Sequence, residues 1–432
     1  MSSVLLKTVG CRLNQAESTE LVDAFQARGA NLVESAADVV VVNTCTVTSE
    51  SSRTSRRLIR RAVAENPDAE VIVTGCYAVA APDEVGAISG VTTVVPNKDK
   101  DEIADRLFGK VVPGASVGLE RRVRRTLKVQ TGCDELCTYC IVPETRGEPS
   151  SRPLGDVVEA AGKLASAGVR EITLSGVHLG KYGFEDSTGI ALLVKELLSA
   201  LPSTVALRLS SIELSCVTDE LIDLLANEAR VCRHLHIPLQ SGDDRVLRAM
   251  GRPYTVDQFL KRAAMASERI DGLALTTDVM VGFPGESDDA FENTLRVVRA
   301  SEFMKLHVFR YSRRPGTQAA EMPDQIGPEA QRDRSQELRR LGDELRLRFH
   351  ERHALRPQTL TALVEAVGAA SQGDPGRPTL HCITDNYMKV LSSGPAGYLG
   401  EYVELQVETV MPSHVRAAPI DDQALRGSGR PG

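Results

Sequence analysis

The sequence predicts an α/β protein in three parts: a parallel α/β domain, a partial (β/α)6 barrel and a small all-β module. The first observation is a β-branched run ending in a cysteine, which recurs three times near the N-terminus. The second is a later series of six strand-like segments that alternate with helix-like stretches. The third is a change to short alternating runs over about the last 75 residues. We place the three parts at residues 1–112, 119–352 and 355–420.

The N-terminal part contains the segments "VLLKTVGC", "DVVVVNTC" and "EVIVTGC". Each is typical of a buried parallel strand, and Cys11, Cys45 and Cys76 follow these strands directly. The cysteines lie 34 and 31 residues apart, which suits one βαβ unit per step. Because parallel strands end at one edge of their sheet, we expect the three thiols to converge. The alternative is three unrelated buried thiols.

A segment rich in Gly, Pro and Arg, "GKVVPGASVGLERRVRRT", predicts a linker from about residue 109. The six strand-like segments that follow alternate with helical stretches such as "DVVEAAGKLASAG", so a parallel barrel, or a large part of one, is expected. Its working face should lie at the C-terminal ends of the strands. They are "TLKVQTG", "REITLSG", "ALRLSS", "RHLHIPLQSG", "LALTTDVMVGFPG" and "KLHVFRYS".

The C-terminal part follows a long charged stretch, "QRDRSQELRRLGDELRLRFHERHALRP", which predicts a helix. After it, "TALVEAV", "DNYMKVLSSG" and "EYVELQVETV" are typical of short strands in a small β module.

Three further cysteines lie close together in "TGCDELCTYCIVPETRG", at Cys133, Cys137 and Cys140. A structural zinc site normally has four protein ligands, and His178 is a whole βα unit away. Three thiolates on a four-iron cluster instead leave one iron open for a substrate or cofactor. Zinc, or three core or redox thiols, are the alternatives.

Composition limits the possible partners. The formal net charge of -7 and the pI of about 5.8 mean that any nucleic-acid site must be a local patch. The sequence has no apolar leader and no apolar stretch of about 18 residues, so we expect a cytoplasmic protein without a membrane partner. In that compartment we expect the nine cysteines to serve metal or redox chemistry.

One basic patch is predicted after Cys45, where five arginines share a helix face. It is a candidate phosphate-binding stripe, and a solvated charged face is the alternative. The residues are Arg53, Arg56, Arg57, Arg60 and Arg61.

At the central thiols the chain resembles the radical S-adenosylmethionine (SAM) superfamily, whose C-x3-C-x2-C motif has an aromatic residue before its third cysteine, here Tyr139. Over nearly its whole length it resembles the methylthiotransferase family with a C-terminal TRAM domain. The matching segments are "GCRLNQAES", "NTCTVT", "VTGCYA", "CTYCIVPETRG", "LSGVHLGKYG", "LRLSSIE", "HIPLQSGDDRVLRAMGRPYT", "DVMVGFPGE" and "FRYSRRPGT". Arg313 stands where Pro is commoner in the family.

The resemblance implies two 4Fe-4S clusters and S-adenosyl-L-methionine. One cluster, on Cys133, Cys137 and Cys140, would chelate SAM, and the other, on Cys11, Cys45 and Cys76, would carry the sulfur to be inserted. It also implies SAM contacts at Tyr139, Ser175, Gly176, Arg208 and Ser210. The alternative is that these residues serve turn geometry and barrel packing. The TRAM likeness implies RNA contacts in the "DNYMKV" strand, at Asn386, Tyr387 and Lys389; a core aromatic is the alternative for Tyr387.

The implied reaction inserts a methylthio group at carbon 2 of threonylcarbamoyl-adenosine next to the anticodon of tRNA. "GCRLNQAE", "ALTTDVMVGFPGE" and "LHVFRYS" favour this branch of the family. The alternatives are isopentenyl-adenosine of tRNA, an aspartate of a ribosomal protein, or a non-catalytic iron–sulfur or zinc RNA-binding protein. Besides tRNA, we expect an electron donor such as flavodoxin or ferredoxin and a sulfur source as partners.

Overall fold

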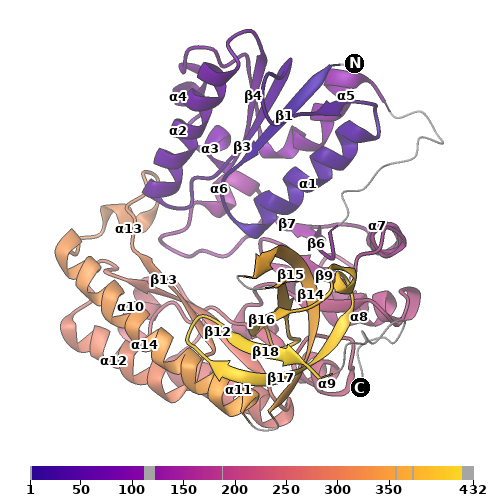
Figure 1. Cartoon of the computed structure of the whole chain (residues 1–432). Coiled ribbons are helices and arrows are strands. Elements are labelled where there is room, and N and C mark those ends of the chain that lie inside the picture. Colours follow the sequence, from indigo (N-terminus) through magenta and orange to yellow (C-terminus); the bar gives the residue numbers. More distant parts are fainter. Residues whose placement is uncertain (1, 111–121, 187, 356–357, 372–373, 421–432) are drawn as a thin grey trace.

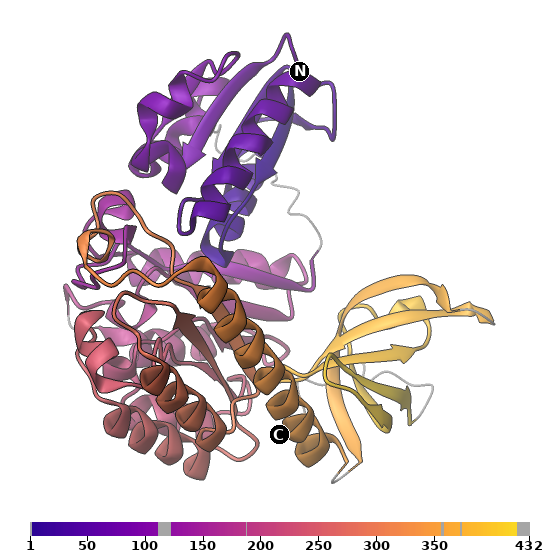
Figure 2. The same ribbon diagram turned by 90° about the vertical axis from the view of Figure 1, so that its left-hand side faces the viewer.

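The computed structural model describes residues 2–110, 122–186, 188–355, 358–371 and 374–420. An N-terminal α/β layer stacks on a curved central sheet, and a C-terminal strand barrel lies beside the long helix that leaves the central part (Figures 1 and 2). The predicted α/β class with a small all-β module is confirmed.

The N-terminal sheet has five strands in the order β2-β1-β3-β4-β5, all paired in parallel. β3 is buried at all six positions, because helices cover both faces of the sheet. The strands are β1 (Ser3–Thr8), β2 (Asn31–Leu32), β3 (Val39–Thr44), β4 (Glu70–Gly75) and β5 (Thr93–Val95). The helices are α1 (Arg12–Gln26), α2 (Ser49–Glu65), α3 (Cys76–Ala80), α4 (Pro82–Gly86), η1 (Asn97–Glu102) and α5 (Ile103–Phe108).

The central sheet has the six parallel strands that the sequence predicts. Two three-stranded sheets, β6-β9-β10 and β11-β12-β13, are joined by parallel bridges from Leu207 to Val231 and from Ser211 to His236. The strands are β6 (Arg124–Lys128), β9 (Glu171–Ser175), β10 (Ala206–Leu209), β11 (His234–His236), β12 (Ala274–Val281) and β13 (Lys305–Arg310). β11 is shorter than its predicted segment, although the chain after His236 follows β12 as far as Gln240, which forms a parallel bridge with Val279.

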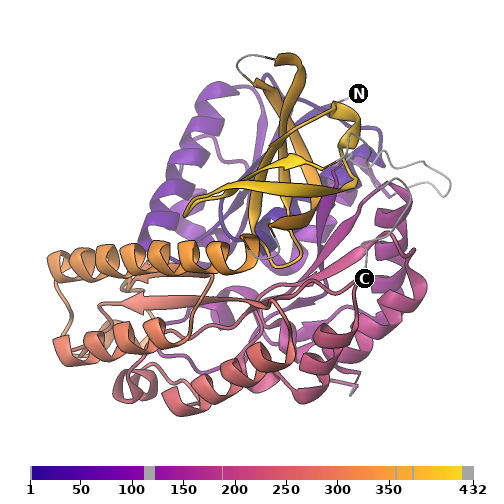
Figure 3. The same cartoon turned by 60° about the horizontal axis from the view of Figure 1, so that its bottom comes forward.

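A helix follows each of these strands and covers the outside of the curved sheet (Figure 3). The apolar stripes of these helices form one large core with the strands. They are α7 (Leu154–Ser166), α8 (Gly189–Ala200), α9 (Asp219–Asn227), α11 (Val256–Arg269), α12 (Asp288–Ala300) and α14 (Pro328–Ala354). Shorter elements lie in the loops: β7 (Gln130–Thr131), α6 (Val142–Arg146), β8 (Ser150–Ser151), η2 (Leu179–Lys181), η3 (Leu214–Cys216), α10 (Asp244–Ala249) and α13 (Gln318–Glu321).

The C-terminal strands close into a barrel in the order β14-β15-β16-β18-β17. Closure pairs every edge and buries alternate apolar side chains such as Leu380, Val390 and Leu405. The elements are β14 (Thr359–Ser371), β15 (Asp374–Ile383), β16 (Lys389–Ser393), η4 (Ala396–Tyr398), β17 (Tyr402–Val410) and β18 (Val415–Pro419).

One detail of the strand prediction is wrong. Asn386 and Tyr387 were expected in a strand, but β16 begins only at Lys389. The residues before it form a tight turn, in which Thr384 N donates to Met388 O and Tyr387 has a φ of +69°. None of the helices in the described ranges is both long and apolar enough to cross a bilayer.

Candidate active site

The three N-terminal cysteines converge at one edge of the sheet, as their positions predict. Cys11 caps α1, Cys45 follows β3 and Cys76 opens α3 directly after β4. A Cβ on Gly10 would lie 2.8 Å from the Cβ of Cys45, and one on Gly75 would lie 2.3 Å from the carbonyl oxygen of Thr44. Both glycines have positive φ, so glycine is what lets these strand ends approach so closely.

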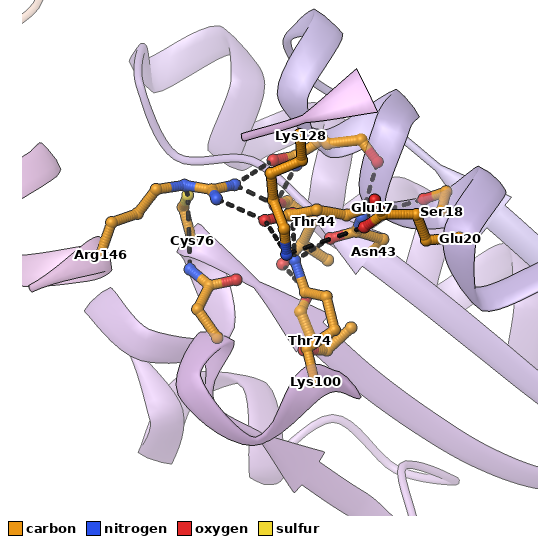
Figure 4. Close-up of polar contacts among 12 residues, drawn as sticks. Glu17, Ser18, Glu20, Asn43, Thr44, Thr74, Cys76, Lys100, Lys128 and Arg146 are labelled. Carbon is orange, nitrogen blue, oxygen red and sulfur yellow. Dashed lines mark hydrogen bonds and ion pairs between the residues drawn. The ribbon is translucent and has the colours of Figure 1, made fainter. Parts of the chain in front are cut away.

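A buried polar network lies beside this triplet and reaches it through an arginine of the central part (Figure 4). Arg146, in α6, places its Nε 3.3 Å from Cys76 Sγ and donates from Nη1 to Glu17 (2.6 Å) and from Nη2 to Asn14 (2.6 Å). Lys100 Nζ lies 2.5 Å from the other oxygen of Glu17. Burial alone would raise the pKa of Glu17, but Lys100 and Arg146 outweigh it and hold the pKa at about 2. No local pattern in the sequence marks Asn14, Glu17, Lys100 or Arg146 as members of this network.

The central triplet is held by backbone contacts. Cys133 N donates to Gly147 O and Cys140 N to Cys137 O, each at 3.0 Å. Thr138 fastens the loop to α10, because its N donates to Met250 O at 3.0 Å. These contacts fix the directions of the three thiols.

Burial holds these thiols in the protonated form unless a group binds them. Burial raises the pKa of Cys133 to about 11 and that of Cys140 to about 12, so an unligated thiol here keeps its proton. Arg252 Nη1 lies 3.3 Å from Cys137 Sγ and is itself paired with Glu213. A positively charged cluster is the kind of group that holds such thiols as thiolates.

The spacing of the thiols speaks against a single zinc ion. Within the described residues, no three cysteine Sγ atoms all lie within 4.8 Å of one another. Four sulfurs at the bond length of a zinc ion would lie about 3.8 Å apart. Neither set is as compact as the ligands of one zinc ion, whereas a cluster of several irons spreads its ligands farther.

A cavity of about 240 Å³ lies where the three parts meet. Alternate residues of the parallel strands face it, since side chains two apart point to the same side of a strand. Its lining comprises Cys11, Arg12, Leu13, Ser175, Gly176, Ser210, Ser211, His234, His236, Thr276, Asp278, Lys305, His307, Phe309 and Tyr387. A larger cavity of about 1420 Å³, between α1, β6 and α7, contains none of the cysteines.

Comparison with known proteins agrees with this geometry. Residues 127–298 match the radical SAM superfamily, and residues 3–96 match the uncharacterized protein family UPF0004. The chain is 36% identical over 430 residues to the threonylcarbamoyladenosine tRNA methylthiotransferase MtaB of Bacillus subtilis, covering 94% of each chain. It is also 36% identical over 368 residues to the MtaB of Thermotoga maritima, covering 82% of this chain and 84% of the relative. The chain belongs to the radical SAM methylthiotransferase family.

A relative with a different named substrate is slightly less similar. The tRNA-2-methylthio-N(6)-dimethylallyladenosine synthase of Endomicrobium trichonymphae is 31% identical, covering 94% of this chain and 96% of the relative. Among solved structures, the radical SAM methyltransferase TsrM of Kitasatospora setae aligns with a TM-score of 0.56 at 18% identity, covering 74% of this chain and 77% of that chain. That likeness concerns the fold.

Radical SAM enzymes use SAM and a 4Fe-4S cluster, and methylthiotransferases carry two clusters. Of the residues expected to contact SAM, the structure places Ser175, Gly176 and Ser210 in the cavity wall. Tyr139 is not part of the cavity lining and packs edge-on against Phe283, with ring centroids 6.4 Å apart. Their contacts with SAM remain predictions for this methylthiotransferase.

Arg208, another predicted SAM contact, is bound by groups of the protein itself. It is fully buried, and its Nε and Nη2 lie 2.8 and 2.9 Å from the two oxygens of Glu171. Its remaining N–H groups donate to the carbonyl oxygens of Asp385 (2.9 Å) and Thr384 (3.2 Å). The guanidinium therefore joins the C-terminal barrel to the central sheet and does not line the cavity in which SAM contacts were expected.

The turn before β16, at residues 384–388, faces the central sheet. The Tyr387 ring stacks on His234, with centroids 4.7 Å apart, and lines the cavity instead of an outer RNA-facing surface. Asn386 is 5% exposed and donates to Gly272 O at 3.2 Å. The cause is the positive-φ turn, which turns these side chains toward the central sheet. Lys389 is exposed, as an RNA contact requires.

The predicted arginine stripe lies on α2 of the enzyme, but carboxylates pair with most of it. Arg60 is exposed and forms no ion pair with any residue in the described ranges. The ion pairs of the other four are Arg53–Glu50, Arg57–Glu50, Arg56–Glu84 and Arg61–Glu65.

Proposed function

We propose that this enzyme inserts a methylthio group at carbon 2 of threonylcarbamoyl-adenosine next to the anticodon of tRNA. One observation carries the proposal: the chain matches a curated relative of that activity at 36% identity over 94% of both lengths. The two separate thiol triplets supply what a reaction with two clusters needs.

In this proposal Cys133, Cys137 and Cys140 hold the cluster that binds SAM. Cys11, Cys45 and Cys76 hold the second cluster. When bound, these groups supply a radical that activates the C–H bond, the sulfur and the methyl group.

The remaining task belongs to the protein's own side chains. Ser175, Gly176 and Ser210 position SAM in the cavity, and Arg146 and Arg252 place positive charge beside thiolates of the two sets. Cys11 lines the same cavity, so a purine bound there lies beside the sulfur-carrying triplet. Residues of all three parts enclose the reacting base and exclude water from it.

tRNA is the substrate in this proposal, and an electron donor such as flavodoxin or ferredoxin and a sulfur source complete the reaction in the cytoplasm. The isopentenyl-adenosine reading is less favoured, because the cavity wall is rich in charged and imidazole groups and a hydrocarbon substituent prefers apolar walls. The ribosomal-protein and non-catalytic readings are not favoured by the curated relatives.

The test is mass spectrometry of digested tRNA nucleosides from cells with and without this gene. We expect 2-methylthio-threonylcarbamoyl-adenosine to disappear and its unthiolated precursor to accumulate. Wild-type protein should restore it, whereas Cys133→Ala should not. Loss of the isopentenyl analogue instead would move the enzyme to the neighbouring branch, and no change in any nucleoside would overturn a tRNA substrate.

A further inference from the structure

The central cavity carries unbalanced positive charge. Arg12 and Lys305 line it, and neither forms an ion pair with a carboxylate of the described chain. Among the described lining residues, Asp278 supplies the carboxylate, but two imidazoles already contact it. His236 Nε2 lies 3.2 Å and His307 Nδ1 3.3 Å from its Oδ1. Asp278 therefore faces the two imidazoles, and no ion pair joins it to Arg12 or Lys305.

Lys305 is the more confined of the two cations. It is half-buried in β13, paired with Thr276 of β12. Burial lowers the pKa of Lys305. The Tyr387 phenol opposes this, and the positive charges of Arg12, Lys389 and Arg346 lower the pKa further. A half-buried ammonium among other cations is unfavourable until an anion binds beside it.

The substrate supplies such an anion. The N6 substituent of threonylcarbamoyl-adenosine ends in a free threonine carboxylate, whereas a dimethylallyl substituent is an uncharged hydrocarbon. Cys11 lines the same cavity, so a base whose carbon 2 faces that triplet brings its N6 substituent into the cavity too. We propose that Lys305, assisted by Arg12, binds the threonyl carboxylate and selects this nucleoside. The inference rests on the proposed function and deepens it.

A tRNA phosphate is the other oxyanion that Lys305 could meet, and binding measurements distinguish the two. The probes are anticodon stem-loops that carry adenosine, threonylcarbamoyl-adenosine or its carboxylate methyl ester at the modified position. We expect the cluster-loaded wild type to bind the free acid about 10-fold more tightly than the other two. Equal binding of acid and ester by the wild type would overturn the carboxylate contact without any mutation.

The variant is Lys305→Met, with Lys305→Arg as the charge-preserving rescue. We expect Lys305→Met to reduce the preference for the acid to about twofold or less and to raise KM for the modified stem-loop, with unmodified binding unchanged. Lys305→Arg should keep most of the preference. Lys261→Met, on the exposed face of α11, is the matched control and should match the wild type. Iron content and SAM cleavage without tRNA report whether each variant is folded and loaded.

The outcomes distinguish failure of the Lys305 inference from failure of the proposed function. Equal weakening of all three stem-loops by Lys305→Met would assign Lys305 to a phosphate and overturn the inference, as would an unchanged preference. If the wild type methylthiolates isopentenyl-adenosine and leaves threonylcarbamoyl-adenosine unreacted, the proposed function itself fails.

Discussion

Arg146 Nε lies 3.3 Å from Cys76 Sγ, although Arg146 lies beside the central cysteine set and Cys76 belongs to the N-terminal set. Arg146 follows Cys140 in the loop of the central triplet, whereas Cys76 opens α3 directly after β4 of the N-terminal sheet. The same guanidinium is fixed by Glu17 at 2.6 Å. One side chain therefore ties the loop of the central triplet to the N-terminal triplet and places a positive charge beside a cysteine sulfur.

Replacing Arg146 should change the electronic properties of the N-terminal cluster. Positive charge and hydrogen bonds at cluster sulfurs raise the reduction potential, so Arg146→Met should lower it by on the order of 60 mV. A redox titration followed by electron paramagnetic resonance measures this potential. The background carries Cys133, Cys137 and Cys140 changed to Ala, so that the signal comes from the N-terminal cluster.

Two further variants decide whether charge is the cause. Arg146→Lys keeps a cation and should recover much of the potential. Arg340→Met removes an exposed arginine of α14 and should leave the potential unchanged. An Arg146→Met protein with the wild-type potential would show that the contact with Cys76 has no electrostatic effect on the cluster.

The convergence of the N-terminal thiols was predictable, whereas the network around them was not. Repeated β-branched runs predict parallel strands, and parallel strands share one C-terminal edge, so Cys11, Cys45 and Cys76 had to meet. Glu17 joins Lys100 and Arg146 across 83 and 129 residues of sequence, and no local pattern marks such a contact.

The turn before β16 shows why a pattern of residue types can mislead. The segment around Tyr387 has the aromatic and apolar residues of a strand, but the pairing of β16 with β15 runs only from Lys389 to Ser393. The turn before it is closed locally by Thr384, whose N donates to Met388 O and whose Oγ1 accepts from Met388 N, and Asp385 and Asn386 are typical turn residues. The hydrogen bonds of Arg208 to the carbonyl oxygens of this turn join residues far apart in the sequence, so no local pattern marks them.

The two clusters should be separable by mutation. Replacing Cys11, Cys45 and Cys76 together with Ala should remove about half of the iron and abolish methylthiolation, because one of two clusters is lost. SAM cleavage to 5'-deoxyadenosine should persist, since the central triplet lies on a different sheet. Iron analysis and anaerobic cleavage assays check this. Full iron content in the triple variant would refute the two-cluster assignment, and Cys382→Ala, in the C-terminal barrel, is the matched control.

Glu171 should stabilise the junction with the C-terminal barrel in a pH-dependent way. Burial alone would raise the pKa of Glu171, but Arg208 and Arg124 outweigh it and hold the pKa at about 2, below the ordinary 4.5. The ionised form is thus favoured in the folded state, so its stabilisation is present above pH 4.5 and is lost as the pH falls toward 2. Glu171→Gln leaves Arg208 buried without a counter-charge and should lower the free energy of unfolding by about 3–5 kcal/mol at pH 7.

Urea unfolding of the metal-free, reduced protein at several pH values measures this difference. The difference in free energy of unfolding between wild type and Glu171→Gln should be constant near neutral pH and decrease below pH 4.5. Glu159→Gln, at an exposed pair with Lys163 on α7, should change the free energy of unfolding by less than about 1 kcal/mol. A gap that stays constant down to pH 3 would contradict the assigned role of ionised Glu171.

The stripe on α2 should bind tRNA unequally along its length. Arg60 has no carboxylate partner in the described chain, whereas Arg61 Nε lies 2.6 Å from Glu65. A phosphate contact by Arg60 releases a counterion, so Arg60→Gln should reduce the slope of log affinity against log salt by about 0.7–0.9. Arg61→Gln should reduce it less, because Glu65 already neutralises that charge. Filter binding of tRNA over a range of salt concentrations measures both slopes. Equal decreases in slope for the two variants would mean that the Arg61–Glu65 ion pair opens on binding. An unchanged slope for both would show that this face of α2 is solvated and does not bind RNA.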